Sequence, residues 1–153
     1  MPPDSRRPSF IESNRRCASL VELVRSRHYL IRVDESCRLV VARRTCERFE
    51  TRAEIECCFD QLAAALAHIE RHDYKLLVDV RQGPARNDPE FEGTIRMHRQ
   101  KLLCGFSCNA ALAATAVGRL QILRYAQSDR REVFATDQPS EAFRHLGIGV
   151  HEI

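Results

Sequence analysis

Two short apolar runs in the middle of the chain each lead into a polar loop and then into a segment with helical periodicity. The first run covers residues 75–80 and precedes the loop 81–89, while the second covers residues 110–114 and precedes residues 115–119. Repeated units of strand, loop and helix are typical of a parallel-type α/β sheet. Ligands and partners tend to bind at the loops that follow such strands, so these two loops are the expected functional region.

A hairpin is predicted ahead of these units, where it would form one edge of the sheet. Two β-rich runs, residues 27–33 and 37–43, are separated by the turn-type sequence Asp-Glu-Ser. Four apolar residues of the hairpin are expected to turn inward: Ile31, Val33, Leu39 and Val41.

Helix-start signals predict four helices. Thr51 and Glu54 match a capping box, and the residues that follow keep an apolar spacing of three and four. Later helices are predicted to begin at residues 88–89, where Asp precedes Pro, at Thr115 and at Pro139.

These elements predict an α/β fold in one compact domain over residues 27–150. We expect a mixed, mostly parallel sheet of about five strands, with the last strand at residues 132–135, an N-terminal hairpin and about four helices. Residues 1–16 carry three of the six prolines and two Arg-Arg pairs, which predicts a mobile arm outside the fold.

Length, charge and cysteine content narrow the class of protein. A chain of 153 residues is long enough for one stable core. Its net charge of +3, with both signs interspersed, argues against a nucleic-acid partner. The chain lacks an apolar run of about 20 residues, which predicts no membrane span, and its start lacks a secretory signal. We therefore expect a cytoplasmic protein whose seven cysteines are reduced.

Three motifs support a family resemblance. They are the strand LLVDVR at 76–81, the helix start RNDPEFE at 86–92, and TAVGRLQ at 115–121. Through them, the stretch 29–147 resembles the STAS/SEC14-type, SpoIIAA-like bacterial domains over about four fifths of the chain. The resemblance implies a compact α/β domain that works by binding other proteins, as anti-sigma-factor antagonists do. Other STAS relatives sense small ligands or nucleotides.

The sequence departs from this family at its phosphorylation switch. In phospho-switched antagonists, a Ser or Thr follows an Asp at the helix start after the central strand, where phosphorylation adds negative charge. Here residues 81–89 contain no hydroxyl side chain, and the first one after them is Thr94.

The predicted binding region lies at the two helix starts. Backbone N–H groups there, with guanidinium groups beside them, favour an anionic ligand or an acidic partner surface. The alternative is that the arginines pair with nearby carboxylates and only fix the loop. Six residues make up the predicted region: Arg81, Arg86, Asn87, Asp88, Thr115 and Arg119.

Catalytic motifs are missing from the sequence. It contains no Walker loop, no Gly-x-Gly-x-x-Gly turn and no Gly-x-Ser-x-Gly elbow. Asp79 and His98 could form an acid–base pair, but an Asp at a strand end more often holds its own loop.

Metal and redox sites are not predicted either. His68 and His72 are four residues apart on the first helix pattern, without a third ligand in view. Cys104 and Cys108 have three residues between them, whereas a redox pair has two.

The sequence thus predicts a non-catalytic regulatory module that needs neither cofactor nor metal. A protein partner would meet the two helix starts through arginines and the exposed apolar groups between them. The alternative is a small-ligand sensor, in which the same helix starts hold a phosphate, a nucleotide or a lipid headgroup.

Overall fold

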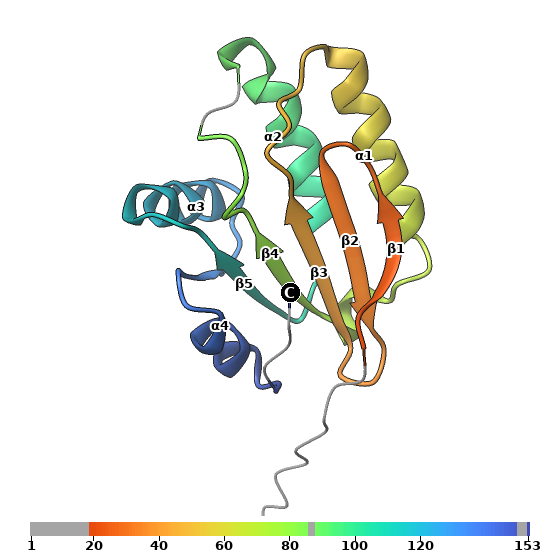
Figure 1. The fold of residues 1–153 in the computed structure, drawn as a ribbon, viewed down its shortest axis with the longest axis vertical. Helices are drawn as coiled ribbons and strands as arrows, with labels where there is room; N and C mark the ends of the chain where they lie inside the picture. The colour runs from red at the N-terminus through yellow and green to blue at the C-terminus, as the bar shows by residue number, and fades with distance from the viewer. Residues whose placement is uncertain (1–18, 86–87, 150–152) are drawn as a thin grey trace, which may run out of the picture.

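The computed structural model describes residues 19–85, 88–149 and 153, and contains one six-stranded sheet whose strands follow chain order. β1, β2 and β3 pair antiparallel, and β3 to β6 pair parallel (Figure 1). This confirms the predicted α/β fold with a mostly parallel sheet and an N-terminal hairpin. The strands are β1 (Val21–Arg25), β2 (Tyr29–Asp34), β3 (Leu39–Arg44), β4 (Lys75–Asp79), β5 (Cys108–Leu112) and β6 (Phe134–Thr136).

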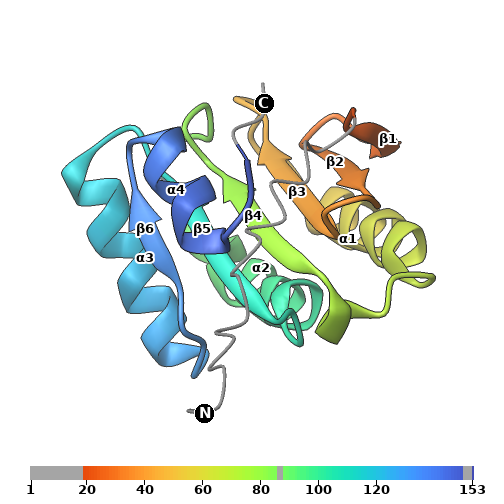
Figure 2. The same ribbon diagram turned by 90° about the horizontal axis from the view of Figure 1, so that it is seen from below.

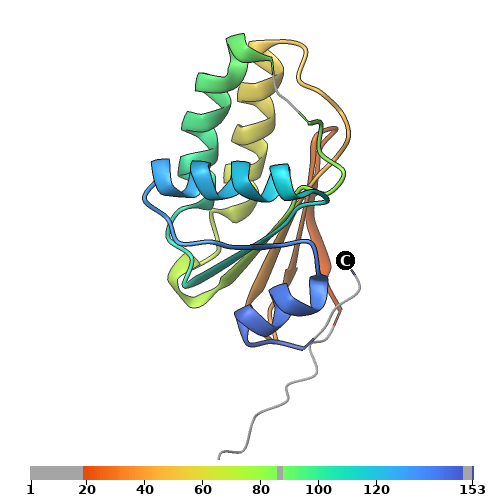
Figure 3. The same ribbon diagram turned by 90° about the vertical axis from the view of Figure 1, so that its left-hand side faces the viewer.

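Four helices connect and cover the sheet. α1, α2 and α3 each join two neighbouring parallel strands, and right-handed crossovers place such helices on one face. α4 follows β6 and lies on the opposite side of the sheet from α1 and α2 (Figure 2). Figure 3 shows α3 running across the direction of α1 and α2. Their bounds are α1 (Arg52–Leu66), α2 (Pro89–Leu103), α3 (Ala116–Ser128) and α4 (Pro139–Leu146), with a short 3-10 turn at Arg71–Asp73.

All four predicted helix starts are confirmed, three of them with a side-chain capping hydrogen bond, whereas α4 begins at Pro139 without one. The side chains of Thr51, Asp88 and Thr115 each accept a hydrogen bond from a backbone N–H two or three residues later, at 2.9 to 3.1 Å. These bonds satisfy donors that a helix start otherwise leaves free. α4 ends at Gly147, whose φ of 67° is a left-handed conformation that glycine adopts without strain.

The core has two layers, one on each face of the sheet. The layer under α1 and α2 contains Ile31 and Val33, whereas the layer under α4 contains Leu39 and Val41. All four residues are buried as predicted, but on opposite faces. The reason is the register of the hairpin. Val33 lies opposite Val40, so these two residues share a face of the sheet, and Leu39 and Val41 on either side of Val40 point to the other face.

The structure adds one strand and corrects one prediction about the cysteines. β1 was not predicted, and residues 1–16 lie outside the described residues. Cys37 forms a disulfide, so the prediction of reduced thiols is wrong for this residue. Among the residues that the structure describes, five other cysteines are free: Cys46, Cys57, Cys58, Cys104 and Cys108.

Candidate functional site

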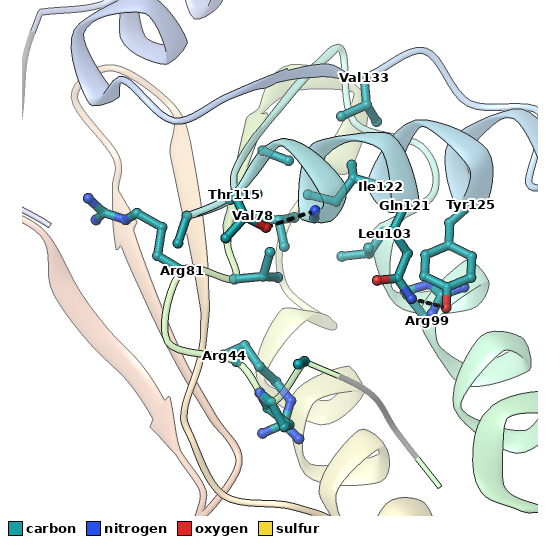
Figure 4. A pocket seen from close by; sticks show the side chains of 18 of the residues that line it. Arg44, Val78, Arg81, Arg99, Leu103, Thr115, Gln121, Ile122, Tyr125 and Val133 are labelled. Atoms are coloured by element: carbon teal, nitrogen blue, oxygen red, sulfur yellow. Dashed lines mark hydrogen bonds between the residues drawn. The ribbon is translucent and has the colours of Figure 1, made fainter. Parts of the chain in front are cut away.

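The loops that follow β4 and β5 lie side by side, because these two parallel strands are neighbours in the sheet. Both loops line one cavity of about 340 Å³, to which the first contributes residues 81 and 83–85 and the second residues 113–115. α3 begins at Thr115 and lies along this cavity (Figure 4). The two segments that the sequence singled out therefore meet at one rim.

Arg81 fixes its own loop. Its Nε and Nη2 donate to the two carboxylate oxygens of Asp79, both at 2.9 Å, and its backbone N–H donates to the same carboxylate at 3.1 Å. The side chain of Asp79 is only 2% exposed. The hydrogen bond to Asp79 raises the pKa of Arg81, and Figure 4 shows the Arg81 side chain pointing away from the other labelled residues. Arg81 therefore pairs with a nearby carboxylate and fixes its loop, which is the alternative to a role in binding an anion.

The other predicted site residues have separate surroundings. Asp88 and Thr115 cap α2 and α3, and their side chains accept backbone hydrogen bonds there. Arg119 forms an ion pair with Asp137, with Nη1 and Oδ1 3.6 Å apart and both side chains partly exposed. Arg86 and Asn87 lie outside the described residues.

The outer side of α3 is apolar. Val117 is 75% exposed, Leu120 59% and Leu123 44%, and they recur every three residues along the helix. Arg119 and Arg124 lie among them, and α3 contains no acidic residue. We call these five residues the α3 surface.

The inner side of α3 is held to α2 partly by polar contacts. The Tyr125 hydroxyl donates to Glu92 Oε1 at 2.8 Å and accepts from Gln121 at 2.8 Å. Asp129, which caps the end of α3, accepts from Gln100 of α2 at 2.6 Å. A helix on a protein surface normally turns its apolar side inward, so α3 departs from the usual arrangement.

Three arginines that the sequence analysis did not single out line the same cavity. Arg44 ends β3, Arg99 lies on α2, and Arg131 follows α3. Two of the three could have been found from the pattern of buried residues. Arg44 lies two residues after the buried Ala42 on β3, and Arg99 four residues after the buried Ile95 on α2, so each shares a face with a buried residue.

Asp79 and His98 do not form an acid–base pair. Asp79 lies on the α4 side of the sheet with Leu77, where it is bound by Arg81. The His98 ring stacks on Phe59 in the layer on the other side, with 5.3 Å between ring centroids. The two groups that acid–base catalysis would need therefore lie on opposite faces of the sheet.

The structure gives the surroundings of the His and Cys pairs that were considered as metal or redox sites. α1 ends at Leu66, so His68 and His72 do not share a helix face. Within 19–85, 88–149 and 153, no three His, Cys, Asp or Glu side chains are grouped as metal ligands would be. Cys104 Sγ donates to a backbone carbonyl of α2, whereas Cys108 Sγ lies 3.5 Å from His145 Nε2.

Comparison with protein-family models, with curated proteins and with solved structures gave no match. The resemblance to STAS-type domains therefore rests on the sequence motifs and stays a prediction. In the part of the chain that the structure describes, no helix combines the length and apolar character needed to cross a membrane.

Proposed function

We propose that this chain is a non-catalytic, cytoplasmic regulatory module that binds a protein partner through the α3 surface. One observation carries the proposal: three of the seven exposed large apolar side chains among the described residues lie on this single helix. Scattered exposed apolar residues are ordinary, but a cluster of them with arginine nearby is typical of a protein interface. The sequence resemblance to STAS-type binding domains supports the same function.

The charge of α3 defines the kind of partner that would fit. The helix contains two arginines and no carboxylate, so a complementary surface would place acidic groups around an apolar centre. In such interfaces a few central apolar and arginine side chains contribute most of the binding free energy. Leu120, which lies midway between Val117 and Leu123, is the expected centre of the contact.

Site-specific photo-crosslinking in the source organism tests this function. A photoreactive amino acid placed at Leu120 should give a crosslinked adduct of defined mass. The same amino acid at Met97, which is 47% exposed on α2, is the matched control and should not give that adduct. Absence of an adduct from position 120, or the same adducts from both positions, would contradict the proposal.

A further inference from the structure

The cavity beneath α3 combines apolar walls with several arginines. Its apolar lining comes from the sheet, α2 and α3, and includes Val78, Ala111 and Ile122. Four arginines line it, of which Arg81 is bound by Asp79 on the other face of the sheet, and no Asp or Glu occurs among the described residues of the cavity wall. Pockets for small organic ligands are typically apolar with a few convergent polar groups, and about 340 Å³ lies at the lower end of their usual range.

Arg44 is a buried cation with an unused donor. The residue is 6% exposed, and its Nη1 donates to the backbone carbonyls of His28 and Thr45 at 3.0 and 3.2 Å. Its Nη2 is buried and has no hydrogen-bond partner. The guanidinium carbon lies 5.2 Å from the Tyr29 ring centroid and 4.9 Å from that of Phe49, so the group is held between rings. Burial lowers the pKa of Arg44.

Arg99 and Arg131 supply further unused donors. The Arg99 side chain is 14% exposed, and its guanidinium lies over the Tyr125 ring at 4.1 Å (Figure 4). Its Nε and Nη2 are buried without a hydrogen bond, and the Asp129 carboxylate is 4.0 Å from Nε. Arg131 likewise has Nε and Nη1 buried without a partner.

Arg99 and Arg131 are near enough to repel each other. Burial is the main cause that lowers the pKa of Arg131. The Asp129 carboxylate opposes this shift, and the charge of Arg99 adds to it. Burial raises the pKa of the Tyr29 hydroxyl, and the charges of Arg44 and Arg99 oppose this shift. Buried guanidinium donors without hydrogen-bond partners are costly, so a cavity with such arginines in its wall favours an anion as its ligand.

We propose that this cavity binds a small organic anion. The carboxylate or phosphate head of the ligand accepts hydrogen bonds from the neighbouring guanidinium groups of Arg99 and Arg131, Arg44 adds positive charge to the same cavity, and the apolar body of the ligand lies against the cavity walls. Charge-assisted bonds to arginine suit both head groups, and phosphate in particular. The inference stands on the cavity alone and does not depend on the protein partner of α3.

Calorimetric titration with four eight-carbon compounds tests the ligand class. Octyl phosphate and octanoate should bind saturably at one site, whereas octanol and octylamine should not. The tighter of the two anions identifies the preferred head group, and inorganic phosphate should bind more weakly than octyl phosphate. Absence of saturable binding for both anions, or equal binding of octanol, would overturn the proposal.

Charge-matched variants locate the site. Arg99→Gln and Arg131→Gln should each raise the Kd of the better anion at least about tenfold, since each removes a charged hydrogen bond. Arg52→Gln removes the same charge from an exposed position on α1, away from the cavity, and should leave the Kd unchanged. Equal effects of all three variants would overturn the assignment. Arg44 is left in place because it also holds two backbone carbonyls.

NMR titration of the wild-type protein covers the case in which a variant fails to fold. Octyl phosphate should shift the backbone amide signals of residues 109–111 and 121–122, which surround the cavity. Shifts confined to other parts of the chain would overturn the proposed location.

Discussion

At the scale of single residues, buried charges determine the geometry at the end of β4. Asp79 is almost fully buried and accepts three hydrogen bonds from Arg81, and Arg43 Nε lies 3.6 Å from the same carboxylate. Buried carboxylates persist only where donors compensate for lost hydration. The loop that leads to the cavity is therefore anchored on the opposite face of the sheet.

Replacement of Arg81 should destabilise the fold. Arg81→Ala leaves Asp79 with fewer donors, and a buried polar group without its partner costs about 1–3 kcal/mol. Arg119→Ala breaks a partly exposed ion pair with Asp137 and should cost only about 0–1 kcal/mol. Urea unfolding at neutral pH measures both. Equal losses in the two variants would contradict the anchoring role of Arg81.

His28 should make stability depend on pH. The residue is 4% exposed, its ring stacks on Phe49 at 4.0 Å, and burial is the main cause that lowers its pKa below the ordinary 6.5. The unfolded chain then binds a proton at a higher pH than the folded chain does. Stability from this group is present above pH 6.5 and is lost as the pH falls from 6.5 toward the folded-state pKa.

Urea unfolding of wild type and His28→Gln at pH 7.5 and pH 5.5 tests this dependence. The wild type should lose more unfolding free energy between the two pH values than the variant does, because glutamine does not titrate. The same loss in both proteins would show that His28 does not contribute to the pH dependence.

At the scale of elements, α1 and α3 use their apolar residues in opposite ways. α1 buries five residues, among them Ile55, Phe59 and Leu62, whereas in α3 only Ala126 is buried. Both helices were predicted from their caps and apolar spacing. Periodicity alone could not show that Leu120 and Leu123 face outward, because it identifies an apolar side without naming its neighbour.

Matched leucine truncations should reveal this difference. Leu62→Ala removes a fully buried side chain and should cost about 2–5 kcal/mol of unfolding free energy. Leu123→Ala removes a side chain that is 44% exposed and should change stability by no more than about 0.5 kcal/mol. Urea unfolding compares them directly. A large loss for Leu123→Ala would mean that α3 packs through its apolar side.

The strands at both sheet edges were the hardest elements to predict. β1 has a strongly exposed pattern, with Val21 and Leu23 directed to solvent and charged residues between and after them. Such a strand is held by backbone hydrogen bonds to β2, and its apolar residues do not mark a buried face. β6 has only three residues and begins two positions after the predicted start.

At the scale of the whole molecule, strand order brings the functional region together. The succession of strand, loop and helix was sufficient to predict that residues 81–85 and Thr115 meet at one rim. The cavity could not be predicted in the same way, because its arginines are far apart in the sequence: Arg44 lies on β3, Arg99 on α2, and Arg131 in the connection between α3 and β6. Their convergence depends on how α2 and α3 pack, which local patterns do not encode.

The affinity of the partner found by crosslinking tests the central claim most directly. Calorimetry should show that Leu120→Glu raises the Kd of the purified partner at least about tenfold, since central apolar contacts contribute about 1.4 kcal/mol or more. Met97→Glu introduces the same charge at an exposed apolar position of α2 and should leave the Kd unchanged. An unchanged Kd in the Leu120→Glu variant would contradict the assignment of the α3 surface as the binding site.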